Sequence, residues 1–195
     1  MTLFILLLAS YLIGAIPTGV VLTHMVGGQD IRKTGSGNIG ATNVYRVAGR
    51  KLGILTLVGD CLKGVFPVAI AVYTLHLPVE QVAGVALAAF LGHCYPVYLK
   101  FKGGKGVATA LGIFLVLSPF SVLGVLGIFV VVLYLWRFIS LASITAAAAV
   151  PFLVLFFERS IPLVVATLVI ATIVIWRHRA NIERLRTGSE NRFNL

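Results

Sequence analysis

Long runs of apolar residues occupy most of the chain. Three of them cover Leu3–Val26, Leu52–Leu75 and Val82–Leu99, and each is close to the roughly 20 residues that an α-helix needs to cross a bilayer core. No basic residue precedes the first run, and the run is longer than the apolar region of a cleaved signal peptide. We therefore expect Met1 to Val26 to remain in the membrane as the first helix.

Two further apolar runs are too long to be single helices. Val107–Trp136 is interrupted at Ser118–Pro119, and Phe138–Trp176 is interrupted at Glu158–Arg159. Unbroken helices of these lengths would extend about 45 and 58 Å, against a bilayer core of about 30 Å. Both runs must turn back, which gives about seven transmembrane helices. The apolar stretch near Val107 to Leu117 is short for a full span, so a re-entrant or half-depth element is the alternative there.

Lysine and arginine predict the orientation of this bundle, because cytoplasmic loops collect these residues. With seven helices and the N-terminus outside, fourteen of the sixteen basic residues fall on the cytoplasmic side, while Arg159 falls outside and Lys63 lies within a helix. Six helices would place Arg137 and the basic tail outside. We predict an all-α integral membrane protein with a cytoplasmic C-terminus and a single polytopic domain over residues 1–195. The fourteen residues are Arg32, Lys33, Arg46, Arg50, Lys51, Lys100, Lys102, Lys105, Arg137, Arg177, Arg179, Arg184, Arg186 and Arg192.

The composition excludes an ordinary soluble protein. The chain is 59% apolar and only 11% charged, whereas about a quarter of a typical soluble protein is charged. A formal charge of +10 would suggest a nucleic-acid partner in a soluble chain. In a membrane protein the excess of Lys and Arg indicates first which loops are cytoplasmic, and we expect no nucleic acid to bind. Cys61 and Cys94 both lie in apolar segments, which favours buried, unreactive thiols over a disulfide scaffold or a zinc site.

The loop after the first helix is rich in glycine and polar residues. Between Gly35 and Arg46 the sequence is GSGNIGATNVYR. Three glycines in six residues allow backbone amides to turn inward and approach an anion closely. Ser36 and Asn38 add hydrogen-bond donors, and Arg46 adds a positive charge. The segment therefore predicts a phosphate-binding loop, with a flexible loop that binds nothing as the alternative.

A second basic, glycine-rich segment, KFKGGKG, runs from Lys100 to Gly106 directly before an apolar stretch. Free amides and the positive end of a helix dipole attract anions, and Lys105 can reach toward such a guest. The segment is not a Walker nucleotide-binding loop, because glycine rather than serine or threonine follows Lys105. A basic anchor that contacts lipid headgroups is the alternative. His93, near the same helix end, is either a packing residue or a ligand.

The last helix ends in a third polar cluster, Trp176–Leu185. On a continued helix His178 and Asn181 share one face, while Arg179 and Glu183 form an i,i+4 pair on another. We expect His178 and Asn181 to point into a common pocket and the arginines to meet lipid phosphates. A basic cap that only anchors the helix is the alternative.

The second helix carries two charged residues, Asp60 and Lys63, three positions apart and on one face. Ionisable residues inside a membrane are costly and mark functional interiors by default. A supporting ion pair and a direct substrate role both remain open. In the seven-helix topology the three polar clusters all face the cytoplasm. Together they predict a basic, glycine-lined cavity beside an apolar bundle, which suits a substrate that carries both phosphate and a hydrocarbon chain.

Five segments together resemble the bacterial acyl-phosphate:glycerol-3-phosphate acyltransferases of the PlsY type. The similarity covers essentially the whole chain, in order and with compatible spacing. The segments are GSGNIGATNVYR at 35–46, DCLKG at 60–64, GHCYP at 92–96, FKGGKGVAT at 101–109 and RHRANIERL at 177–185.

This resemblance implies an enzyme of the bacterial inner membrane whose active site faces the cytoplasm and is formed by loops 27–51 and 98–106 and the tail 177–195. Its substrates would be acyl phosphate and glycerol 3-phosphate, and its products would be lysophosphatidic acid and phosphate. It would be in contact with membrane lipids and would need no cofactor and no metal. The implied catalytic residues are Ser36, Arg46, Lys105, His178 and Asn181. The implied substrate-binding residues are Gly35, Gly37, Asn38, Gly40, Thr42, Asn43, Asp60, Lys63, His93, Gly103, Gly104 and Gly106.

The chemistry of acyl phosphate is compatible with direct transfer. A mixed anhydride carries its own leaving group, so neutralising and positioning two anions can replace a covalent enzyme nucleophile. His178 and the substrate phosphate are both candidates for the proton acceptor. An organic-phosphate transporter is the competing hypothesis, but it needs a polar path to the far side, where the loops offer little beyond His76, Glu80, Glu158 and Arg159.

Overall fold

The structure, a computed structural model, describes residues 2–193, and all the regular structure in that range is helical. The predicted all-α fold class is therefore confirmed. Met1, at the start of the expected first helix, and residues 194–195 of the expected tail lie outside the described residues. The chain divides into two compact units, Met1–Val116 and Leu117–Leu195, which we call the N-terminal unit and the C-terminal unit.

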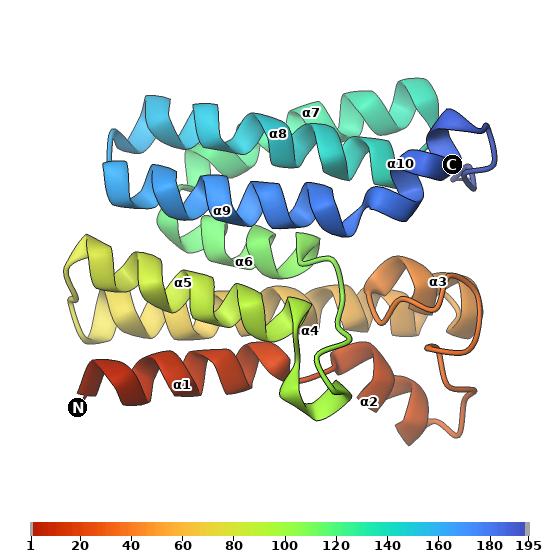
Figure 1. The fold of residues 1–195 in the computed structure, drawn as a ribbon, viewed down its shortest axis with the longest axis horizontal. Helices are drawn as coiled ribbons and strands as arrows, with labels where there is room; N and C mark the ends of the chain where they lie inside the picture. Colours follow the sequence, from red (N-terminus) through yellow and green to blue (C-terminus); the bar gives the residue numbers. More distant parts are fainter. Residues whose placement is uncertain (1, 194–195) are drawn as a thin grey trace. The chain divides into compact units, whose positions relative to one another are not determined.

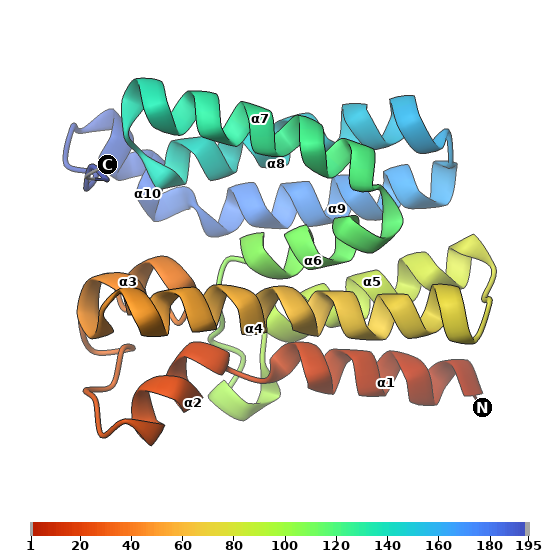
Figure 2. The ribbon, with the colours of Figure 1, turned by 180° about the vertical axis from the view of Figure 1, so that it is seen from behind.

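In the N-terminal unit, α1 packs along α5, and both pack against α4 (Figures 1 and 2). The short α2 and α3 pack at one end of α4. The elements are α1 (Thr2–Ala15), α2 (Thr18–Met25), α3 (Ala41–Ala48), α4 (Arg50–Ala69) with a π-helical extension η1 (Ile70–Thr74), α5 (Val79–Cys94), a 3₁₀ turn η2 (Val97–Leu99) and α6 (Val107–Leu117).

Glycines let the helices of this unit approach backbone to backbone. A Cβ on Gly92 of α5 would overlap the Tyr11 carbonyl of α1. In the same way, a Cβ on Gly112 of α6 would overlap the Cys61 carbonyl of α4, and one on Gly64 would overlap the Thr109 carbonyl of α6. Small residues at such contacts are typical of membrane helices, whose association depends on close van der Waals packing. These three glycines therefore fix the spacing of the helices that they join.

Replacing Gly112 by leucine is expected to lower the melting temperature of the detergent-solubilised protein. The new side chain meets a backbone carbonyl that cannot move aside, and overpacking of this kind costs about 1–3 kcal/mol. Gly127 is the matched control, because nothing lies within 4 Å of the Cβ position there. Equal melting temperatures for Gly112→Leu and Gly127→Leu would contradict the close approach of α4 and α6.

The first apolar run is not one helix, which corrects the prediction for Leu3–Val26. α1 ends at Ala15, α2 begins at Thr18, and their axes differ by 46°. Pro17 explains the break, since it has no N–H and its ring clashes with the carbonyl four residues earlier. The Ile13 carbonyl instead accepts a hydrogen bond from the Ile16 amide at 3.2 Å.

In the C-terminal unit, α8 packs between α7 and α9, as Figure 2 shows. Both long apolar runs break where the sequence predicts. α7 starts at Pro119, a residue suited to the first turn of a helix. α8 ends at Glu158, and Arg159 follows with a left-handed φ of 50°. The elements are α7 (Pro119–Trp136), α8 (Ile139–Glu158), α9 (Ile161–Arg177) and α10 (Arg179–Arg186).

The expected continuous C-terminal helix is also wrong, because the chain bends by 53° between α9 and α10. His178 is the residue at the bend. The predicted pair of Arg179 with Glu183 gives way to another contact, since the Arg179 guanidinium lies 4.5 Å from the centre of the Trp176 ring. Such stacking keeps the charge at the end of the apolar helix.

Four helices among the described residues are long and apolar enough to cross a membrane, or up to six if each bent pair is one span. α6, with 11 residues, is shorter than a span needs, as its sequence suggests. The predicted count of seven helices and the orientation of the termini remain predictions. The four helices are Arg50–Thr74, Val79–Leu99, Pro119–Trp136 and Ile139–Glu158.

Candidate active site

The first glycine-rich loop is organised by one buried side chain, that of Asn43 in α3. Its Oδ1 accepts a hydrogen bond from the Ser36 amide at 2.8 Å. Its Nδ2 donates to the carbonyls of Ile31 and Asn38 at 2.9 Å, and to that of Thr34 at 3.2 Å. One carboxamide thus ties together both arms of the loop. Since these contacts engage both ends of its amide, Asn43 shapes the loop from within.

Close approach to Asn43 also explains why glycine stands at position 35. The φ of Gly35 is +60°, and a Cβ there would overlap the Asn43 Oδ1 atom. After Gly35 the loop is exposed to solvent at Ser36 and Gly37. Ser36 and Arg46 are exposed, while Asn38 is partly buried and accepts a 2.8 Å hydrogen bond from the Gly40 amide.

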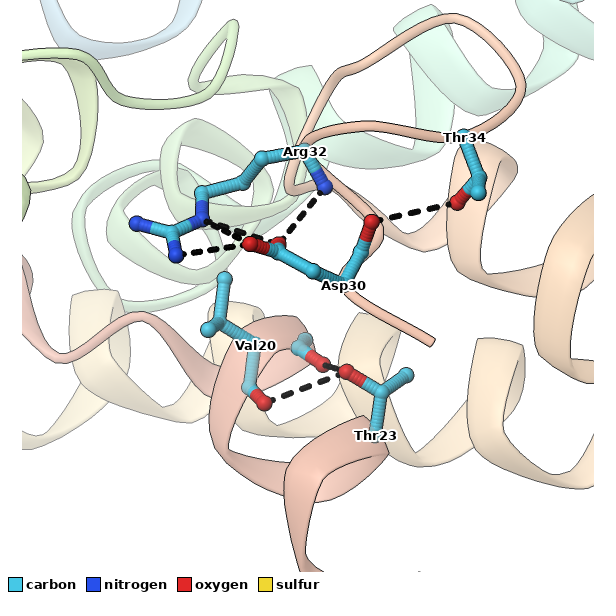
Figure 3. Close-up of polar contacts among 6 residues, drawn as sticks. Val20, Thr23, Asp30, Arg32 and Thr34 are labelled. Atoms are coloured by element: carbon cyan, nitrogen blue, oxygen red, sulfur yellow. Dashed lines mark hydrogen bonds and ion pairs between the residues drawn. The ribbon is translucent and has the colours of Figure 1, made fainter. Parts of the chain in front are cut away.

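The segment that leads into this loop is held by short-range contacts, which Figure 3 shows. Arg32 donates to both carboxylate oxygens of Asp30, with Nη2 at 2.8 Å from Oδ2. The guanidinium lowers the pKa of Asp30 to about 2. Thr34 Oγ1 donates weakly to the Asp30 carbonyl, at 3.3 Å. In α2, Thr23 Oγ1 donates to the Gly19 and Val20 carbonyls, at 2.8 and 3.1 Å.

The loop rests on α2 and on an apolar cluster of Ile31, Ile39 and Val44. Gly19 of α2 lies so close that a Cβ would overlap the Ile39 carbonyl. Leu99, directly before the second glycine-rich segment, packs against the same cluster. The structure therefore brings together the two basic loops that the sequence singles out.

The second loop, residues 100–106, folds onto the end of α5. The Gly104 amide donates to the His93 carbonyl at 3.1 Å, and a Cβ on Gly104 would overlap the His93 ring. Gly103 lies equally close to the His93 carbonyl, and Gly106, with φ of +86°, lies against the Phe90 ring. These glycines are thus required for close packing against the end of α5. They hold the partly buried Lys105 between them.

The predicted pairing of Asp60 with Lys63 in α4 is confirmed. Lys63 Nζ lies 2.9 Å from Asp60 Oδ1, and the two side chains are only 5% and 3% exposed. Lys63 also donates to the Ile16 carbonyl at 2.8 Å. His93 Nδ1 lies 3.8 Å from the same Asp60 oxygen and is equally buried. The Cys61 thiol beside them is only partly buried, whereas that of Cys94 is buried.

In the C-terminal unit, His178 and Asn181 are both buried, at 3% and 6% exposure. His178 Nδ1 lies 2.8 Å from the Val174 carbonyl. A carbonyl can only accept, so Nδ1 carries a proton and donates it to this contact. Asn181 Nδ2 donates to Glu190 Oε1 at 2.7 Å.

Glu190 is a residue that the sequence analysis did not single out. Besides Asn181, it accepts hydrogen bonds from Ser140 Oγ at 2.8 Å and Arg184 Nε at 2.6 Å. Burial alone would raise the pKa of Glu190, but these three hydrogen bonds outweigh it and hold the pKa below its ordinary value. The Phe193 amide donates to the Arg137 carbonyl at 2.6 Å. The tail is thereby fastened to the start of α8.

Acidification is expected to release this tail. Because the folded-state pKa of Glu190 is depressed from 4.5, its contribution to stability is present above that pH and is lost as the pH falls through the folded-state value. Hydrogen–deuterium exchange of residues 187–193, corrected for intrinsic rates, should accelerate in that window. Glu190→Gln should exchange fast already at neutral pH. A tail whose protection is the same in both proteins at every pH would contradict this role.

A family model and the curated relatives of this chain carry the same description. The family model for glycerol-3-phosphate acyltransferase matches residues 4–188. Curated relatives of that description include one from Syntrophotalea carbinolica, 66% identical over 97% of both chains, and one from Geotalea daltonii, 60% identical over 97% of this chain and 96% of the relative.

Two solved structures of PlsY, described as an integral membrane glycerol 3-phosphate acyltransferase, also match. One is the glycerol 3-phosphate form, with a TM-score of 0.94, and the other is the lysophosphatidic acid form, with a TM-score of 0.92. Each is 40% identical to this chain and is matched over 100% of this chain and 96% of its own.

Proposed function

The chain belongs to the glycerol-3-phosphate acyltransferase family, and from that premise we propose that it transfers a fatty acyl group from acyl phosphate to the sn-1 hydroxyl of glycerol 3-phosphate. The products are lysophosphatidic acid and inorganic phosphate. The observation that carries the proposal is the whole-chain similarity to a protein solved with glycerol 3-phosphate and with lysophosphatidic acid. These two molecules are the acceptor and the product of the proposed reaction.

In the proposed reaction, catalysis depends mainly on cations of the two basic loops that neutralise the charge of the two phosphates. Arg46 and Lys105 clamp the two phosphates, because a charge-assisted contact is roughly twice as strong as a neutral one. The exposed Ser36 hydroxyl orients a phosphate oxygen. The glycine-rich backbone of both loops, with Asn38 and Thr42, completes the substrate contacts, and Asn43 holds the first loop in shape.

His178 and Asn181 serve the acceptor hydroxyl in the same proposal. Glu190 can only accept, so it fixes the amide nitrogen of Asn181 toward itself and the amide oxygen away from itself. That oxygen is suited to accept a hydrogen bond from a substrate hydroxyl. In this proposal either a neutral His178, whose Nδ1 donates to the Val174 carbonyl, or a substrate phosphate oxygen accepts the hydroxyl proton.

The transfer itself is a single displacement at the acyl carbon. The glycerol oxygen forms a bond to that carbon, the bond from the carbon to the bridging oxygen breaks, and inorganic phosphate leaves with the electron pair. The hydroxyl proton passes to one of the two acceptors. No enzyme nucleophile is required, because the mixed anhydride is already activated.

We also propose that the reaction takes place at the cytoplasmic face of the bacterial inner membrane, with the N-terminus outside. A single cysteine at Ser189, which is exposed in the structure, should resist impermeant maleimide in intact cells and react after the cells are opened. Labelling in intact cells would contradict this orientation, since the basic residues would then lie on the wrong side.

The direct test of the function is an assay of the purified protein in lipid. Palmitoyl phosphate and glycerol 3-phosphate should give lysophosphatidic acid, whereas palmitoyl-CoA should not replace the donor. Ser36→Ala should lower turnover without lowering folded yield. Uptake of glycerol 3-phosphate into proteoliposomes without any acylation would instead indicate a transporter.

A further inference from the structure

The Asp60–Lys63 ion pair lies within an apolar helix, and both of its side chains are more than nine-tenths buried. Removing two charges from water is costly, and good geometry with further hydrogen bonds is needed to offset that cost. Lys63 makes one such hydrogen bond, to the Ile16 carbonyl, and Asp60 has the buried ring of His93 beside it. The Ile16 carbonyl lies in the break between α1 and α2, whereas His93 lies at the end of α5.

Lys63 connects the pair to the first loop. Its Nζ donates to the Ile16 carbonyl at 2.8 Å, in the break where Pro17 ends α1. The break sets the direction of α2, and α2 carries Gly19, which lies against the Ile39 carbonyl of the first loop. Lys63 therefore stabilises the turn on which that loop depends.

Asp60 connects the pair to the second loop. The oxygen that faces Lys63 also lies 3.8 Å from His93 Nδ1. The ring of His93 fills the space beside Gly104, and its carbonyl accepts the Gly104 hydrogen bond. The carboxylate therefore lies beside the ring that packs on Gly104, next to the backbone that carries Lys105.

We propose that Asp60, Lys63 and His93 form one positioning unit, which sets both glycine-rich loops at once and does not contact substrate. This deepens the proposed function and rests on it. Because a single ion pair supports both loops, its loss should weaken binding of glycerol 3-phosphate and of acyl phosphate together. If these residues instead bound the phosphate of one substrate directly, their loss would weaken the binding of that substrate only.

The test compares Lys63→Met, Asp60→Asn and the double variant with Ser10→Ala, a buried substitution in α1 remote from the break. Each single variant leaves one buried partner uncompensated and should lower the melting temperature. The neutral double variant should recover most of that loss. Its KM for both substrates should nevertheless stay raised about tenfold or more, the range expected for a lost hydrogen bond to a charged group. Ser10→Ala should keep both KM values.

A second readout is independent of catalysis. Spin labels at Lys33→Cys and Lys102→Cys, in a background without Cys61 and Cys94, report the separation of the two loops. The double Asp60→Asn/Lys63→Met variant should broaden this distance distribution, while Ser10→Ala should not. An unchanged distribution, or a stable double variant with wild-type KM for both substrates or a change in only one, would overturn the proposal. If the wild type does not acylate glycerol 3-phosphate at all, the proposed function fails, and the spin-label distances alone decide the positioning role.

Discussion

Replacing Lys105 by alanine is expected to lower kcat/KM by roughly 10- to 150-fold. This is the range that corresponds to losing a charge-assisted hydrogen bond of about 1.5 to 3 kcal/mol. Lys105 stands between glycines that pack on the end of α5, so the backbone that carries its side chain is fixed. Arg46→Ala should have an effect of similar size, because each cation compensates a phosphate that carries charge through the transition state.

Two nearby cations provide matched controls for these variants. Lys102 and Arg50 are exposed neighbours in the second loop and at the start of α4, and their alanine variants should keep kcat/KM within about threefold, as for surface charges that only attract substrate. Kinetics are to be measured on equal amounts of folded protein. If Lys105→Ala and Lys102→Ala behave alike, Lys105 contributes only to the surface charge.

Replacing Asn43 by aspartate is expected to lower the rate of transfer strongly while the helices remain folded. The substitution is isosteric, but a carboxylate oxygen would then face the three carbonyls of Ile31, Thr34 and Asn38. Each buried group left unsatisfied costs about 1–3 kcal/mol. The combined cost exceeds what a surface loop can absorb, so we expect the loop to lose its shape and activity to fall about 100-fold or more.

Thr34→Val is the control for Asn43→Asp, because it removes only the 3.3 Å hydrogen bond to the Asp30 carbonyl in the same loop. Circular dichroism should show equal helix content in both variants, and limited proteolysis should cut the Asn43→Asp protein faster within residues 31–40. Wild-type activity in Asn43→Asp would show that the reaction does not depend on the loop conformation.

The helices follow from the sequence because apolar length is a strong signal. Runs longer than the bilayer must break, and Pro119 and Arg159 mark breaks that the structure contains. The break at Pro17 could not be predicted in this way, because the apolar run Leu3–Val26 is short enough for one span and membrane helices tolerate proline. The bend at His178 could not be predicted either, because the residues around it continue to read as helix.

The sequence marks the two glycine-rich loops, but it does not show which contacts give them their shape. GSGNIGATN marks a loop that can approach an anion, yet no pattern tells that Asn43 points inward and organises the loop. The contact of Glu190 with Ser140 joins residues 50 positions apart, and a polar tail gives no periodicity from which to infer it. The Asp60–Lys63 pair was predictable because its i,i+3 spacing on one helix is local.

Direct transfer from acyl phosphate is the step on which the proposed function rests, and one rapid-quench experiment tests it. The purified protein is mixed with radioactive palmitoyl phosphate, with and without glycerol 3-phosphate, and label is followed in protein and in lipid. We predict that lysophosphatidic acid forms only when glycerol 3-phosphate is present, and that no label becomes bound to protein at any time. Label that accumulates on Ser36 or Cys61 and is discharged by glycerol 3-phosphate, or a complete lack of labelled product, would contradict direct transfer.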